Sequence, residues 1–415
     1  MKISEIKPEA YELGKRAEEK TEPYFRTIDA IAGENSRKVM QAFQDNKVSE
    51  ACFSGTTGYG YDDLGRETLD KIYAQVFGTE SALVRVNFVN GTHALTAALF
   101  SLCRPGEKLL SVNSAPYDTL RRAIGIEGDD FGSLAFYGIG YEQTELTDEG
   151  CFDFQAISDA LKDGSIKAVI LQRSCGYGFR KAFSIENIKE LCSFVKSLRP
   201  DVYILADNCY GEFTEFLEPT QVGADLIAGS LIKNPGGGIA PTGGYLAGKA
   251  EVVERAAFRL TSPGIGGECG STLGNNRLLY QGLFLAPHTV AQALKTSVFA
   301  AAVMDELGIE SYPAYYEKRS DIIQRIRLGS PERMKRFCEG IQAGAPVDSY
   351  VTPEPWDMPG YSCPVIMAAG SFIQGSSIEL SADGPFKAPY DVYLQGGLTY
   401  ETGRLGILMA VSAIL

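Results

Sequence analysis

The sequence predicts an α/β protein with a mostly parallel sheet that carries helices on both faces, followed by a smaller C-terminal α+β domain. From residue 81 to about residue 248, short apolar runs alternate with amphipathic stretches, a pattern typical of a mostly parallel sheet. After residue 248 the pattern changes to a long helical region over 273–307, then to mixed helices, short strands and several prolines. A chain of 415 residues is also too long for one small core.

Two helices and a loop are predicted before the sheet. Residues 8–32 predict a helix, because Pro8 suits a first turn and a long polar face follows. Residues 53–65 are rich in Gly and Tyr and predict a loop. Residues 67–77 predict a second helix, whose apolar residues share one face: Leu69, Ile72, Tyr73 and Val76.

The alternating region sets out the elements of the sheet in order. The predicted strands are 82–86, 108–112, 133–137, 167–171, 202–206, 226–230 and 242–247. The helices predicted between them are 92–102, 117–124, 154–161 and 185–198. We therefore divide the chain into an N-terminal helix and arm (1–60), a large domain (61–272), and a long helix with a small domain (273–415).

The composition limits the class of partner and the compartment. The formal net charge is −13, and an acidic surface argues against nucleic acid or an anionic membrane as the main partner. No apolar run reaches the roughly 18 residues of a membrane span, and the start lacks a secretion-signal pattern. Nine Cys without C-x-x-C spacing and only two His predict free thiols in a reducing cytoplasm and no metal site.

Two polar residues follow predicted strands, at the sheet edge where ligands of open α/β sheets bind. Asp207 directly follows the run 202–206, and Lys233 comes three residues after the run 226–230. An amine can form an imine with an aldehyde cofactor, and a carboxylate can keep that cofactor's ring nitrogen protonated. Asp207 alone could cap a helix and Lys233 alone could be a surface lysine. Only the two residues together indicate a site for an aldehyde cofactor.

Further residues at this edge could complete a site for a phosphorylated cofactor. Gly91 and Thr92 open a predicted helix, whose N-terminus favours phosphate. Ser230 could add a hydroxyl or simply end a strand. Tyr117 could stack on an aromatic ring or pack in the core. The glycines at 236–238 do not form a P-loop, which requires Gly-Lys-Ser/Thr at its end.

Two phenols, Tyr59 and Tyr61, lie in the Gly-rich loop. Their position suggests either reach into a site, including the site of a neighbouring subunit, or local packing.

The order Gly91-Thr92, Tyr117, Asp207, Ser230 and Lys233 resembles fold-type I enzymes that use pyridoxal 5′-phosphate (PLP), and among them the Cys/Met metabolism group. Three segments look like the aluminium-resistance or methionine γ-lyase-like branch of that group: 58–66, 172–177 and 231–238. The resemblance covers nearly the whole chain. It implies a sheet of the seven-stranded type, an amino-acid substrate, and a homotetramer with sites at dimer interfaces.

The resemblance also implies roles for these residues. Lys233 would hold PLP as a Schiff base and move protons, and Asp207 would pair with the pyridinium. Gly91, Thr92 and Ser230 would hold the phosphate, and Tyr117 would stack on the ring. Tyr59 or Tyr61 would come from the adjacent subunit, to contact phosphate or aid departure of the leaving group.

The sequence departs from the better-known group at two places. Ile232 stands before Lys233, where the group has a hydroxyl, and Tyr59-Gly60-Tyr61 replaces its Tyr-x-Arg pair. Arg173 and Arg180 are candidates for a cofactor- or substrate-binding arginine, and Arg404 sits where the group often places its carboxylate-binding arginine. Each of the three could instead be a surface residue.

The resemblance favours a carbon–sulfur lyase that eliminates a thiol from a sulfur-containing amino acid, of the cystathionine β-lyase or methionine γ-lyase type. Two alternatives remain open from the residues alone. One is another fold-type I PLP enzyme, an aminotransferase, aldolase or racemase. The other is a protein that binds PLP without catalysis.

Overall fold

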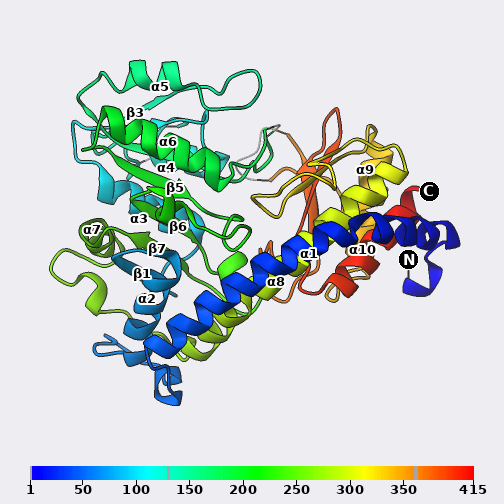
Figure 1. The fold of residues 1–415 in the computed structure, drawn as a ribbon, viewed down its shortest axis with the longest axis horizontal. Coiled ribbons are helices and arrows are strands. Elements are labelled where there is room, and N and C mark those ends of the chain that lie inside the picture. The colour runs from blue at the N-terminus through cyan, green and yellow to red at the C-terminus, as the bar shows by residue number, and fades with distance from the viewer. Residues whose placement is uncertain (1, 129–130, 179, 359–362) are drawn as a thin grey trace.

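The computed structural model describes residues 2–128, 131–178, 180–358 and 363–415. A seven-stranded sheet forms the larger part, and a five-stranded antiparallel sheet lies in the C-terminal part (Figure 1). The predicted fold class is therefore confirmed. Among the described residues, no helix combines the length and apolar character needed to cross a membrane.

The large sheet has the strand order β1-β7-β6-β5-β4-β2-β3. Strands β2 to β6 run parallel to one another, whereas β7 is antiparallel to both of its neighbours. Its strands are β1 (Ser81–Arg85), β2 (Lys108–Ser111), β3 (Gly140–Gln143), β4 (Ile166–Gln172), β5 (Tyr203–Asp207), β6 (Leu226–Ser230) and β7 (Gly244–Gly248).

Helices cover both faces of this sheet because successive strand residues point to opposite sides. In β5, Ile204 and Ala206 enter one core while Leu205 enters the other. One core contains α2 (Leu64–Phe77), α5 (Phe154–Ala160), α6 (Ile185–Leu198) and the first part of α8 (Asn276–Glu306). The opposite core contains α3 (Gly91–Leu102), α4 (Asp118–Ile124) and α7 (Ala250–Leu260).

The small sheet has the strand order β10-β11-β12-β9-β8, and α9 (Pro331–Ala343) packs against it. Its strands are β8 (Ser311–Tyr312), β9 (Gln324–Arg327), β10 (Val365–Ala369), β11 (Ser381–Pro385) and β12 (Asp391–Gln395). Helix α10 (Tyr400–Ile414) packs against α9 and α8. Short 3-10 helices lie at Ile3–Glu5, Glu50–Phe53, Pro219–Val222, Asn234–Gly236 and Gly266–Glu268.

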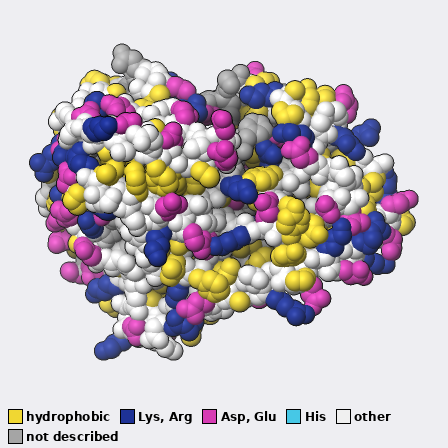
Figure 2. All heavy atoms as spheres, turned by 45° about the horizontal axis from the view of Figure 1, so that its top comes forward, with side chains coloured by type: hydrophobic (Ala, Val, Ile, Leu, Met, Phe, Trp, Pro, Cys, Tyr) yellow, Lys and Arg dark blue, Asp and Glu magenta, His cyan; other side chains and the backbone are white. Residues whose placement is uncertain are grey.

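The long helix α1 (Pro8–Asp45) packs along α8, and the two run side by side past both sheets (Figure 1). The end of α8, from Phe299 to Met304, belongs to the core of the small sheet. The predicted division at residues 60 and 272 stays a prediction. Both signs of charge are interspersed over the face of the molecule shown in Figure 2.

Two sequence expectations are corrected. The run 133–137 is not a strand; the backbone N–H groups of Leu134 and Ala135 donate to carbonyls at the end of α4. The edge strand is instead β3, which is polar and half-exposed and therefore lacks the apolar run of a central strand. The first helix also continues past residue 32 to Asp45, as part of the packing of α1 on α8.

Candidate active site

A cavity of about 320 Å³ lies at the carboxyl ends of β4, β5 and β6 and reaches the small sheet. This is the sheet edge at which α/β proteins bind ligands. It is lined by residues of the large domain and by four residues nearer the small sheet, Ile323, Asp383, Tyr393 and Gln395. Lys233, Asp207, Gly91, Thr92, Tyr117 and Ser230 all line it. The structure thus brings together six of the residues singled out from the sequence.

Asp207 and Lys233 reach the cavity from neighbouring parallel strands. Asp207 is the last residue of β5, opposite Ala228 of β6, and Lys233 follows three residues after the end of β6. Asp207 is 4% exposed, and its Oδ1 accepts a hydrogen bond from the backbone N–H of Cys209 at 3.1 Å. The Lys233 Nζ lies 4.0 Å from the centroid of the Tyr210 ring. The amine therefore faces an aromatic wall rather than bulk water.

Asp207 and Lys233 each stabilise the charged form of the other. Burial raises the pKa of Asp207, and the nearby Lys233 acts in the opposite direction. Burial alone would lower the pKa of Lys233, but Cys209, Tyr210 and Asp207 raise it above its ordinary value. Without a ligand, the cavity therefore holds Lys233 as an ammonium beside a carboxyl group.

The start of α3 forms the phosphate-binding end expected from the sequence. Asn90 caps this helix by accepting a hydrogen bond from the backbone N–H of His93 at 2.9 Å. A Cβ atom at Gly91 would lie 3.2 Å from the Ser230 Cβ, so a glycine keeps the space beside Ser230 open. The first N–H groups of a helix have no intrahelical partner and bind phosphate well. The donors present therefore suit a phosphate group.

An aromatic side chain closes this end of the cavity. The Tyr117 hydroxyl lies 3.0 Å from the Thr92 Oγ1, which fixes the ring next to the start of α3. Burial raises the pKa of Tyr117, so the phenol stays neutral at ordinary pH. A neutral ring held beside the phosphate donors suits stacking on an aromatic cofactor.

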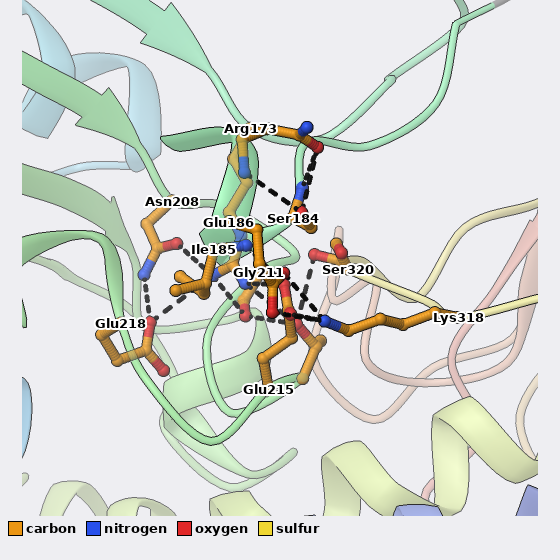
Figure 3. A network of polar contacts seen from close by, with 12 residues as sticks. Arg173, Ser184, Ile185, Glu186, Asn208, Gly211, Glu215, Glu218, Lys318 and Ser320 are labelled. Carbon is orange, nitrogen blue, oxygen red and sulfur yellow. Dashed lines mark hydrogen bonds and ion pairs between the residues drawn. The ribbon is translucent and has the colours of Figure 1, made fainter. Parts of the chain in front are cut away.

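Arg173 has a different environment from the one expected of a ligand-binding arginine. Its guanidinium is fully buried and donates to the Asn208 Oδ1 and the Gly211 carbonyl, both at 2.9 Å. It also forms ion pairs with Glu215 at 3.1 Å and Glu218 at 3.5 Å. Figure 3 shows this network, which ties the segment after β5 to the end of β4. Arg173 does not line the cavity.

The other two candidate arginines also lie outside the cavity lining. Arg180 is in an adjoining hollow that shares Tyr117, Gln172 and Tyr177 with the cavity, and it donates to the Gln172 carbonyl at 2.6 Å. Arg404 is on α10, where its guanidinium binds both carboxylate oxygens of Glu18 on α1, at 2.7 and 3.0 Å. Arg404 therefore links two helices.

Tyr59 and Tyr61 do not line the cavity of their own chain. Their side chains are 75% and 53% exposed, and the ring centroids are 5.9 Å apart. The guanidinium of Arg66 donates hydrogen bonds to the carbonyls of Gly60 and Gly270, and these bonds tie the loop to the segment before α8.

Sequence reasoning missed several lining residues. Cys209 and Tyr210 directly follow Asp207, so their place after a strand end could have indicated them. Asp383, Tyr393 and Gln395 lie on the small sheet, for which the sequence offered no comparable landmark.

Comparison with known proteins identifies the family. The sequence profile of the methionine gamma-lyase family matches residues 10–415. The chain belongs to the methionine gamma-lyase family. This membership makes it an enzyme of the carbon–sulfur lyase type.

Relatives of this methionine gamma-lyase family protein cover nearly its whole length. A carbon–sulfur lyase involved in aluminium resistance, from Clostridium novyi, is 53% identical, with a TM-score of 0.96 over 99% of this chain and 97% of that one. The uncharacterized protein YnbB of Bacillus subtilis is 49% identical over 94% of this chain and 93% of its own.

More distant proteins share less. The L-methionine gamma-lyase of Pseudomonas putida is 24% identical over 51% of this chain and 49% of its own. The PLP-dependent protein YhfS of Escherichia coli shares the fold alone, at 18% identity and a TM-score of 0.60 over 91% of this chain and 94% of that one.

Proposed function

We propose that this enzyme holds PLP on Lys233 and eliminates a sulfur-containing leaving group from Cβ or Cγ of an amino acid, as cystathionine β-lyases and methionine γ-lyases do. The observation that carries the proposal is the placement of Asp207 and Lys233 on neighbouring strand ends in one cavity, with the N-terminus of α3 at its edge. When bound, PLP supplies an aldehyde that joins the substrate amine and a protonated ring that withdraws electrons from Cα.

The residues of the chain bind and orient the cofactor and transfer the proton. Asp207 holds the proton on the pyridine nitrogen. Gly91, Thr92 and Ser230 bind the phosphate, and Tyr117 orients the ring. The Lys233 Nζ, once it is free of PLP, removes the proton from Cα of the substrate. Pairing of Asp207 with a cationic ring offsets one charge that raises the pKa of Lys233, which favours the neutral amine that a base requires.

The exposed tyrosines fit a site completed by a second chain. Tyr59 and Tyr61 are phenols on an ordered loop, exposed in the single chain and absent from its own cavity lining. In a dimer they would reach the neighbouring site, contact the phosphate or assist departure of the leaving group. A homotetramer built from such dimers is part of this proposal.

The proposal is tested by the spectrum and products of the purified protein. Wild-type protein is expected to show the visible absorption of a lysine-bound PLP and to release 2-oxo acid from at least one of cystathionine, methionine or cysteine. Lys233→Ala should lose both, because no amine remains in the cavity to hold the aldehyde.

Lys335→Ala is the matched control. Lys335 lies on α9, outside the cavity, and binds Glu354 at 2.7 Å. Its loss should leave the colour and the products unchanged. A Lys233→Ala protein that is folded and as yellow as the wild type would refute the assignment.

A further inference from the structure

The cavity contains a second buried carboxyl group that the proposed chemistry leaves without a role. Asp383 lies on β11 of the small sheet and lines the same cavity as Lys233. It is 6% exposed. The Gln395 Nε2 donates to its Oδ2 at 3.1 Å, whereas its Oδ1 is buried with no hydrogen-bond partner among the described residues.

Asp383 has no cation to balance it. Among the described residues that line the cavity, Lys233 is the only cation, and it faces Asp207. No ion pair of Asp383 is present in the described part of the chain. Burial raises the pKa of Asp383 to about 6, and a hydrogen-bonding interaction with the Tyr177 side chain, a neutral group, acts in the opposite direction. A buried carboxylate with an unmatched oxygen is costly unless a cation or donor meets it.

Asp391 shows what a structural aspartate looks like in the same sheet. It lies on β12 and is 5% exposed, so it is at least as buried as Asp383. Both of its carboxylate oxygens bind the guanidinium of Arg327, at 3.0 and 3.3 Å. The half-matched state of Asp383 is therefore a property of its position on the cavity wall rather than of the small sheet.

A ligand bound in the cavity could supply the hydrogen-bond partner that the Asp383 Oδ1 lacks. The α-amino group of the substrate reacts with the PLP aldehyde near Lys233, so it is not free to bind here. A second positive group, carried on the part of the substrate beyond the bond that breaks, would supply both the missing hydrogen bond and the missing charge. An ammonium is suited to this, because it offers both charge and hydrogen-bond donors.

We propose that Asp383 binds a distal ammonium group of the substrate, so that the enzyme favours amino acids with a second amino group beyond the sulfur. This inference rests on the proposed function. It assigns Asp383 as a specificity-determining residue and the substrate as a thioether with an amino group at each end.

The test uses two ligands that contain no sulfur and cannot be cleaved at a carbon–sulfur bond. 2,7-Diaminooctanedioate carries a distal amine, and 2-aminooctanedioate lacks only that amine. Binding to the PLP-loaded enzyme is measured by calorimetry. The wild type should bind the diamino ligand at least about tenfold more tightly, as expected for a desolvated charge pair. Asp383→Asn should bind the two ligands within about twofold of each other, because a neutral amide of the same shape supplies no charge.

Asp391→Asn is the control, since it neutralises an equally buried aspartate outside the cavity. If it is folded by circular dichroism, it should keep the wild-type preference. A wild type without preference, or an Asp383→Asn protein that keeps the preference, would overturn the role of Asp383.

Product assays separate the two proposals. If wild-type enzyme forms 2-oxo acid from methionine or cysteine as efficiently as from cystathionine, the lyase function stands and the inference on Asp383 fails. If it forms no 2-oxo acid from any of these, yet Asp383→Asn abolishes the preference for the diamino ligand, the role of Asp383 stands and the lyase function fails.

Discussion

Arg173 is a charged side chain that supports the site without touching its cavity. Glu215, which it binds, also accepts a hydrogen bond from the backbone N–H of Ile185 at 3.0 Å and pairs with Lys318 at 2.8 Å. The network therefore joins the segment after Asp207 to the start of α6 and to the approach to the small sheet (Figure 3). Its effect on catalysis would be through the position of Asp207.

Arg173→Met should be strongly destabilising. The change leaves Glu215 and Glu218 buried without their main cation, and loss of one partner from a buried pair costs about 3–5 kcal/mol. Urea unfolding monitored by circular dichroism measures the effect. Arg37→Met is the comparison, because Arg37 forms an exposed pair with Glu34 and its loss should leave the midpoint nearly unchanged. Equal midpoints for the two variants would contradict this account.

At the scale of elements, one aspartate fixes the loop that carries the exposed tyrosines. Asp63 caps α2 through the backbone N–H of Arg66 at 2.9 Å. Its carboxylate also accepts hydrogen bonds from Thr56, Thr272 and Asn276. The loop over 56–62 is therefore anchored both to α2 and to the segment before α8.

Asp63→Ala should loosen this loop, and it should lower the free energy of unfolding by more than the loss of the helix cap alone would. The cap is worth about 1 kcal/mol, and the unmatched donors left behind add to the loss. We expect faster cleavage by trypsin near the loop and a lower unfolding midpoint. Asp62→Asn changes the exposed neighbour, which has a φ of 55° that Asn tolerates, and should behave like wild type. Similar cleavage rates for both variants would argue against the anchor.

The elements also show what the sequence could predict. Central strands such as β4 to β6 are apolar because helices cover both of their faces, so their runs were found. Edge strand β3 is half-exposed and carries no such run. Lys233 and Asp207 could be located because they follow central strands. Asp383 could not, because in an antiparallel strand the alternation of residues does not distinguish a face toward a core from a face toward a cavity.

At the scale of the whole molecule, the proposed sharing of sites between subunits can be tested by mixing chains. Lys233→Ala and the double variant Tyr59→Ala/Tyr61→Ala should each be nearly inactive alone. If each site takes its lysine from one chain and its tyrosines from another, a mixed dimer contains one intact site. Random reassembly of equal amounts should then restore about a quarter of wild-type activity.

Gel filtration of the wild type, with elution at four times the mass of one chain, checks the tetramer. No gain of activity on mixing, with reassembly shown by exchange of a labelled chain, would place the tyrosines in their own chain or outside the site.

The shared helix α8 has a mechanical consequence for the cavity. Its first part is embedded in the core of the large sheet, its last residues in that of the small sheet, and α1 is strapped along its length. A rotation of the small sheet relative to the large sheet would have to bend α1 and α8 and disturb the packing of both hydrophobic cores. The distance between the cavity walls that carry Lys233 and Asp383 is therefore expected to stay nearly constant. A cavity of constant width selects substrates by their length.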